Sequence, residues 1–191
     1  NVWAGFAQVL NNAEELGCVP TRLKQARQVH IPKKGKGVRE DGATNAAALR
    51  PICVFSCIWR IWMGARLQSS QATNWVAEWL PSEVVSGRKG QDCSTALIEI
   101  CEGYAQGKYL GTFDYSMCFD YINPKIAVEC FRYLGMSEKT ANVLEDMWTG
   151  QMRMLQYGEE VHPRLHPAGS STPQGDPWAM MATAVVLAGP L

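Results

Sequence analysis

Apolar positions at the start of the chain recur with a helical period and then give way to short continuous runs. Between Val2 and Leu16 they fall every three or four residues, and Gly17 follows as a stop signal, which predicts a helix. Two β-prone runs come next, Ala26 to Pro32 and Leu49 to Val54. Residues 33–46 between them are rich in Gly and charge, which is typical of a loop. The pattern therefore predicts a basic β-hairpin after the first helix.

The middle of the chain predicts a long helix, a polar turn, a second helix and a strand. Apolar positions recur with a helical period from Ser56 to Trp79, which predicts the long helix. After the turn, Asp92 or Ser94 would cap the second helix. The run Tyr109 to Phe113 is apolar and β-prone, so we expect a strand that carries Asp114 at its end.

The last third of the chain predicts helices on both sides of a hairpin. The expected elements are helices over 124–134 and 137–148, strands over 152–157 and 161–165, and a buried helix over 178–187. Taken with the first hairpin, these elements place the chain in the α+β class, with an antiparallel sheet packed on helices.

Composition narrows the class of protein. The chain has 191 residues, of which 47% are apolar and 19% charged, as in a globular protein that buries a core. The net charge is zero, so no global basic field attracts nucleic acid. Basic residues nevertheless gather locally, since eight of them lie between Arg22 and Arg50 against two acidic ones.

The cysteines and the longest apolar runs exclude some kinds of site. The seven cysteines are odd in number and lie in apolar runs, so we expect free, buried thiols in a reducing compartment. Cys53 and Cys57 have no second pair or nearby His, which argues against a zinc site. No apolar run approaches the ~20 residues of a membrane span, so no membrane partner is expected.

Two short motifs carry the candidate chemistry. The first places Asp114, Tyr115, Phe119 and Asp120 in one polar and aromatic run over residues 111–122. The second is Ser-Thr-Pro-Gln-Gly-Asp-Pro over residues 171–177. The first resembles motif A of reverse transcriptases, and the second resembles motif B of the non-LTR retrotransposon and group II intron types.

Three further segments extend this resemblance in the same order along the chain. Residues 30–35 (His-Ile-Pro-Lys-Lys-Gly) and 49–52 (Leu-Arg-Pro-Ile) resemble fingers motifs of the family, and residues 86–91 resemble the element before motif A. The matches cover roughly residues 28 to 188. They imply the fingers (residues 1–110) and a partial palm (residues 111–191) of a right-hand polymerase.

The resemblance also implies roles for individual residues. Asp114 and the backbone carbonyl of Tyr115 would hold Mg²⁺, for which Mn²⁺ could substitute, and Phe119 would be a steric gate against the ribose 2′-hydroxyl. The remaining roles are triphosphate or nucleotide contacts for Lys33, Arg50, Gln174 and Gly175, and nucleic-acid contacts for Lys34 and Arg88. We expect Lys33, Arg50 and Asp114 to converge on one cleft.

The activity implied is that of an RNA-directed DNA polymerase. Its partners would be an RNA template, a DNA primer and deoxynucleoside triphosphates, and its location intracellular, in the nucleus if the element is eukaryotic. The family's motif C, an Ala-Asp-Asp hairpin, is not found after Asp176. We therefore expect a fragment truncated before motif C that is inactive alone, because two-metal catalysis needs those carboxylates.

The same residues also allow other interpretations. Asp114 could cap a turn, Phe119 could pack in a core, and Pro-Gln-Gly-Asp-Pro could be only a turn and helix N-cap. The basic segment suits a polymerase, although a solvated Lys-rich loop explains it equally well. At the level of function, the rivals are a non-catalytic nucleic-acid-binding module derived from a reverse transcriptase and an RNA-dependent RNA polymerase. The pair His162 and His166 is expected to be a coincidence, because Pro163 and Pro167 interrupt any helix there.

Overall fold

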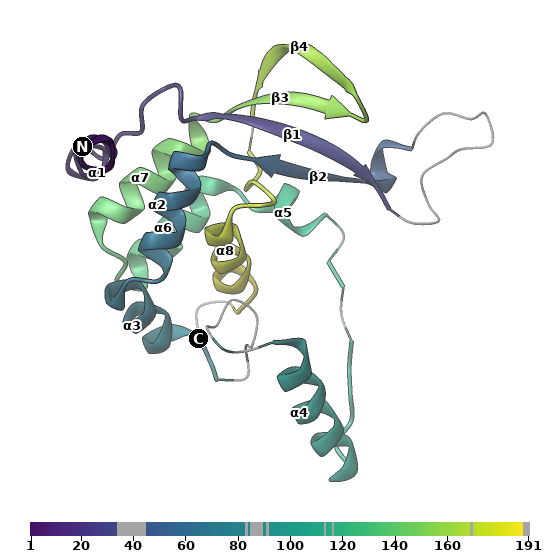
Figure 1. The fold of residues 1–191 in the computed structure, drawn as a ribbon. Coiled ribbons are helices and arrows are strands. Elements are labelled where there is room, and N and C mark those ends of the chain that lie inside the picture. Colours follow the sequence, from purple (N-terminus) through teal and green to yellow (C-terminus); the bar gives the residue numbers. More distant parts are fainter. Residues whose placement is uncertain are drawn as a thin grey trace.

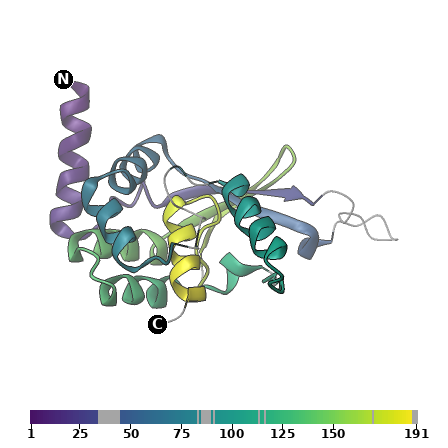
Figure 2. The same ribbon diagram turned by 90° about the horizontal axis from the view of Figure 1, so that it is seen from below.

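A four-stranded sheet packs on a layer of helices in the computed structural model (Figure 1, Figure 2). The structure describes residues 1–33, 45–82, 84, 90, 92–112, 114, 115, 117–168 and 170–188. The strands are β1 (Gln25–Pro32), β2 (Leu49–Val54), β3 (Met152–Tyr157) and β4 (Glu160–Pro167). The helices are α1 (Val2–Leu16), the short 3-10 helix η1 (Ala46–Ala48), α2 (Cys57–Leu67), α3 (Ser70–Trp79), α4 (Cys93–Ala105), α5 (Cys118–Tyr121), α6 (Pro124–Tyr133), α7 (Glu138–Thr149) and α8 (Pro177–Ala188). This mixture of helices and one sheet is compatible with the predicted α+β class.

The sheet is mixed, which corrects the expectation of an antiparallel one. Its strand order is β2-β1-β3-β4, with β1 and β2 antiparallel, β3 and β4 antiparallel, and β1 and β3 parallel. Both predicted hairpins are therefore confirmed, and their association was missed. A parallel pair needs a long crossover connection, and helices α2 to α7 lie between β1 and β3 in the chain.

The predicted helices are confirmed except for the long one. Gly17 ends α1 in the left-handed conformation with a φ of 61°, and Asp92 caps α4 through its side chain. The helical run from Ser56 to Trp79 is divided into α2 and α3, which corrects the single predicted helix. Ser69 causes the break, because its hydroxyl donates to the Arg66 carbonyl and accepts from the Ala72 N–H as a new N-cap.

Tryptophans dominate the core. Trp59 and Trp62 stack with their rings 4.6 Å apart, and Trp75 meets Phe131 edge-on at 5.4 Å. Trp148 and Trp178 are also fully buried. The core cluster joins α2, α3, α6, α7 and α8, and the sheet joins β1–β2 to β3–β4. The two segments expected to form fingers and palm therefore share one sheet and one core.

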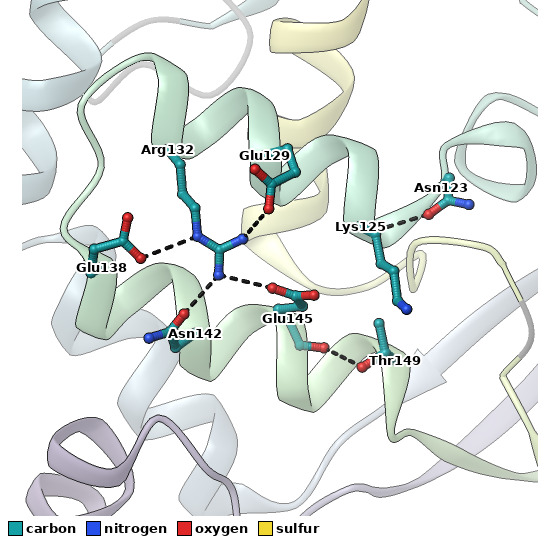
Figure 3. Close-up of polar contacts among 8 residues, drawn as sticks. All are labelled: Asn123, Lys125, Glu129, Arg132, Glu138, Asn142, Glu145 and Thr149. Carbon is teal, nitrogen blue, oxygen red and sulfur yellow. Dashed lines mark hydrogen bonds and ion pairs between the residues drawn. The ribbon is translucent and has the colours of Figure 1, made fainter.

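A charged network ties α6 to α7 on the surface of this core (Figure 3). The Arg132 guanidinium donates to Glu129, Glu138, Asn142 and Glu145. Burial lowers the pKa of Arg132, but the hydrogen bonds to Glu145, Glu129 and Glu138 outweigh that effect and raise it overall. The network thus fixes the antiparallel packing of the two helices that support motif B.

Residues 109–112 of the strand expected over 109–113 do not form a strand, which corrects a second expectation, and Phe113 lies outside the described residues. Helix α4 has no buried residue and projects away from the body, and residues 108–112 run back from it as an extended segment beside no strand (Figure 1). Tyr109 is fully exposed, and Leu110 is also exposed. An apolar run without a neighbouring strand cannot satisfy its backbone groups as a ladder, so the local β-propensity has no effect here.

The cysteines are free, but most of them are not buried. All seven cysteines are free, as expected, but only Cys53 is buried, which corrects the expectation that they are buried thiols. Cys118 and Cys130 are half-buried, and the other four are exposed.

Within the described residues, no helix has the length and apolarity needed to cross a membrane.

Candidate functional site

The two candidate motifs meet at a junction between Thr172 and Phe119. The Thr172 N–H and hydroxyl both donate to the Phe119 carbonyl at 3.0 Å, and the same N–H lies 3.1 Å from the carbonyl of Ile122. Phe119 belongs to α5, a single turn that follows Met117, whose φ of 54° is left-handed. The motif B segment (residues 171–177) therefore packs on the motif A segment (residues 111–122).

Motif B also packs closely on strand β2. The Cys53 N–H donates to the Gln174 carbonyl at 2.7 Å, and a Cβ placed on Gly175 would lie 2.6 Å from the Cys53 carbonyl oxygen. Gly175 has a φ of 116°, which side-chain-bearing residues rarely adopt. The close approach expected of Gly175 is therefore to the backbone of β2, and no contact with nucleic acid is needed to explain it.

Asp176 is a buried carboxylate that organises the start of α8. It is 2% exposed and accepts hydrogen bonds at 2.9 Å from the Trp178 N–H and the Trp148 indole. Burial raises the pKa of Asp176 to about 6. The Trp148 indole, the Trp178 N–H and the Trp59 indole oppose this rise. The Trp59 indole lies nearby but forms no hydrogen bond of good geometry. The helix N-cap considered for this motif is thus present, at Asp176.

Arg153 was not predicted, and it is the most buried cation near the two motifs. It is 7% exposed on β3, and its hydrogen bonds go to Gln28, Gln151 and Ser171. The charge of Arg153 affects the neighbouring Cys53 thiol. Burial raises the pKa of this thiol to about 11, and Arg153 opposes the rise. The carboxylates of Asp176 and Asp120 add to it. A charged residue inside a mostly apolar strand was the only signal in the sequence.

A cavity of about 660 Å³ opens between the sheet and the start of α5. Its wall includes Gln28 and His30 from β1, Pro51 from β2, and Met117 and Asp120 from motif A. The other lining residues are Ala46, Leu49, Leu155, Gln156, Tyr157, Glu160, Val161, His162 and Pro163. Met117 and Asp120 flank Phe119 in sequence, so the junction of motifs A and B lies beside this cavity.

The structure does not bring three of the predicted site residues to this cavity. Its lining residues do not include Lys33, Arg50 or Asp114. Arg50 pairs with Ile31 in register, one residue away from the pair of Pro51 and His30. Because successive strand residues point to opposite faces, the Arg50 side chain lies on the face away from the cavity. The expected convergence of the three residues is therefore not found in this cavity.

The other predicted site residues lie at varied depths. Asp114 and Tyr115 are exposed in the segment before α5, Phe119 is half-buried, and Gln174 is half-buried with its carbonyl on β2. Lys33 is half-buried beyond the end of β1, where its N–H donates to the Ala48 carbonyl. Lys34 and Arg88 lie outside the described residues.

The donors expected for Mg²⁺ match the ion in kind but not in number. The Asp114 carboxylate and the Tyr115 carbonyl are hard oxygen ligands, which Mg²⁺ prefers together with water and phosphate oxygens. Among the described residues, no three His, Cys, Asp or Glu side chains come together to hold a metal. These two donors would need further oxygen ligands to form a metal centre.

The two histidines on β4 lie close together, and the expectation that their spacing is a coincidence with respect to metal binding stays a prediction. The His166 Nε2 and His162 Nδ1 atoms lie 3.0 Å apart, and the rings are 4.8 Å apart. The pairing of β3 with β4 shifts register between Met154 and Gln156, whose partners are Leu165 and Val161, and His162 lies within the part of β4 that this shift spans.

Comparison with known proteins adds no family to this description. No protein-family model matches the chain, and no curated protein matches it.

Proposed function

We propose that this chain is the fingers and N-terminal palm part of an RNA-directed DNA polymerase of the non-LTR or group II intron type. The activity would be extension of a DNA primer on an RNA template with deoxynucleoside triphosphates. One observation carries the proposal: Thr172 and Phe119, 53 positions apart and in two polymerase-like motifs, are hydrogen-bonded beside a cavity. Contact between the two motifs is what a shared site would require, and this supports the proposal.

The cavity suits the base or sugar of a nucleotide better than its phosphates. Its volume of about 660 Å³ lies within the range of roughly 300–1,000 Å³ that is usual for small-ligand sites. Leu49, Pro51 and Leu155 give it an apolar wall, and Gln28 offers a hydrogen-bonding amide. The described lining residues include the carboxylates Asp120 and Glu160 and no Lys or Arg, so a bare triphosphate would be repelled.

Asp114 is the proposed metal ligand. It is exposed just before α5 and therefore accessible to a hydrated ion. When bound with its remaining ligands, Mg²⁺ would neutralise charge on the transferred phosphates. The role of this chain would be to hold the ion through Asp114 and the Tyr115 carbonyl, and to keep Phe119 in place through Thr172.

Primer extension by a polymerase that contains this chain tests the proposal. Asp114→Asn should lower extension on an RNA template at least about a thousandfold, since it removes a metal charge, and should leave primer–template binding within about twofold. Asp92→Asn is the matched control, because Asp92 is another exposed Asp and an Asn there still caps α4. Extension should be unchanged in that variant.

Three results would contradict parts of the proposal in different ways. Binding of primer–template without extension by the wild-type protein would favour the non-catalytic binding module. Preferential use of ribonucleotides would favour an RNA-dependent RNA polymerase. Near-normal extension by Asp114→Asn would remove Asp114 from the site.

A further inference from the structure

Arg153 is a buried guanidinium whose hydrogen-bond partners are all neutral. Its Nε donates to Gln151 Oε1 at 2.6 Å, and its Nη1 donates to Gln28 Oε1 at 3.0 Å. On the motif B side, Nη1 and Nη2 reach the hydroxyl and carbonyl of Ser171 at 3.2 and 3.3 Å. Among the described residues, no carboxylate forms an ion pair with it. A buried charge in this setting is costly, so its retention calls for a role beyond packing.

The guanidinium fixes the orientation of the Gln28 side chain. Arginine has only donors, so the Gln28 atom at Nη1 must be the carbonyl oxygen. The amide nitrogen of Gln28 then faces His30 Nε2 at 3.0 Å and must donate to it. Gln28 therefore cannot turn over to offer an acceptor on this side of the cavity.

The same constraint fixes the hydrogen on the His30 ring. Because Gln28 donates to Nε2 of His30, that ring nitrogen must carry no hydrogen. The other nitrogen, Nδ1, lies 3.2 Å from the backbone carbonyl of Gln156, which can only accept. These two contacts therefore agree on the tautomer with the His30 hydrogen on Nδ1.

The other end of the network holds motif B. Ser171, which accepts two of the Arg153 hydrogen bonds, directly precedes Thr172. Thr172 in turn is bonded to the Phe119 carbonyl. One guanidinium therefore connects the β1 wall of the cavity to the junction of motifs A and B. A Lys could not replace it, because a single ammonium cannot reach Gln28, Gln151 and both Ser171 atoms in a fixed plane.

We propose that Arg153 is a positioning residue that sets the Gln28–His30 wall of the cavity and the motif B segment in one arrangement. Its importance for nucleotide selection rests on the proposed function, but the arrangement itself does not. Arg153 acts through Gln28 and Ser171, and it does not line the cavity.

Nuclear magnetic resonance on the 191-residue chain tests this without any polymerase assay. At about pH 8, above the ordinary titration range of histidine, ring ¹⁵N–¹H correlations should show His30 with hydrogen on Nδ1 and bare Nε2. In Arg153→Met, the Gln28 side-chain N–H and the Thr172 backbone N–H should each exchange with water at least about tenfold faster, which corresponds to ~1.4 kcal/mol. A residue that merely fills space would leave both exchange rates in place.

Matched variants separate the two ends of the network. Gln28→Leu should release His30 and leave the Thr172 exchange rate within about twofold of wild type. Arg27→Met removes an exposed arginine at the adjacent β1 position and should change neither rate. If Arg153→Met does not fold, Arg153→Lys and Gln28→Leu test the proposal in its place. Arg153→Lys should still speed exchange of the Gln28 side-chain N–H and of the Thr172 backbone N–H. A wild-type His30 with hydrogen on Nε2, or unchanged exchange in both Arg153 variants, would overturn the proposal.

Discussion

Both donors of Thr172 point at one oxygen, the backbone carbonyl of Phe119, and both lie 3.0 Å from it. Thr172 is 1% exposed, so water does not compete for these bonds. Phe119 lies in a helix of only four residues, which is too short to be stable without tertiary contacts. Motif B is therefore part of what keeps α5, the helical turn within motif A, in its conformation.

Thr172→Val isolates the hydroxyl contribution to this junction. Valine keeps the shape and the backbone N–H but loses one buried hydrogen bond, so we expect the free energy of unfolding to fall by about 1 kcal/mol. Urea denaturation measures the change. Thr183→Val is the control, because the Thr183 hydroxyl bonds the Ala179 carbonyl within α8 and not across two motifs. Only Thr172→Val should also speed amide exchange at Phe119 and Asp120, and equal exchange in the two variants would contradict the role of the junction.

Gly175→Ala tests the close approach of motif B to β2. The new Cβ would lie 2.6 Å from the Cys53 carbonyl oxygen, a backbone atom that cannot move without distorting the strand. Gly158→Ala is the matched control: its φ of 57° is also left-handed, but no atom lies within 4 Å of the added Cβ. We expect Gly158→Ala to cost about 1 kcal/mol and Gly175→Ala at least about 2 kcal/mol more, or to prevent folding. Similar losses in thermal unfolding would mean that motif B does not pack on β2 as described.

Asp176 should make stability depend on pH in an unusual direction. Its folded pKa of about 6 exceeds the ordinary value of 3.8, so the folded state binds its proton more tightly than the unfolded state does. The stabilisation from this group is complete below about pH 4 and is lost as the pH rises through about 6, by on the order of 3 kcal/mol. Asn at this position carries no charge at any pH. The stability of Asp176→Asn relative to wild type should therefore improve between pH 4 and about 7.

A second variant checks the origin of this pH effect. The Trp148 indole N–H lowers the pKa of Asp176, so Trp148→Phe should raise that pKa further and move the transition to higher pH. Urea denaturation at a series of pH values measures both variants. A stability difference between wild type and Asp176→Asn that does not vary with pH would show that the carboxylate is not perturbed.

Local sequence signals predicted most of the helices and strands. The long-range contacts between them were missed for a physical reason. The caps at Gly17 and Asp92 and the hairpin strands depend on a few adjacent residues, so they could be predicted. The parallel pairing of β1 with β3 depends on how the intervening helices pack, and nothing within either strand records it. The strand expected before Asp114 failed for the same reason, since β-propensity acts only when a partner strand is present.

The candidate site divides in the same way. The motifs at Asp114, Phe119 and Gln174 were found because their residues are contiguous. The burial of Arg153 and Asp176 was not found, because it depends on elements from distant parts of the chain. Arg50 was correctly placed on a strand, but its side chain lies on the face away from the cavity, and strand register alone decides that.

Sugar selection separates DNA synthesis from RNA synthesis and depends on Phe119. Its backbone is held by Thr172, so substitution should change only the half-buried ring. In a polymerase that contains this chain, Phe119→Val should open space for a 2′-hydroxyl. Ribonucleotide use relative to deoxynucleotide use should then rise at least about tenfold, or ~1.4 kcal/mol in transition-state binding. Steady-state kcat/KM values with the two nucleotides give this ratio.

Tyr121→Val is the control, since Tyr121 lies on the same helix and its side chain is 78% exposed. Shrinking this ring should leave the ratio of ribonucleotide to deoxynucleotide use unchanged. If both rates fall together in Phe119→Val with the ratio unchanged, Phe119 only packs against the core, and motif A gives no argument for deoxynucleotides.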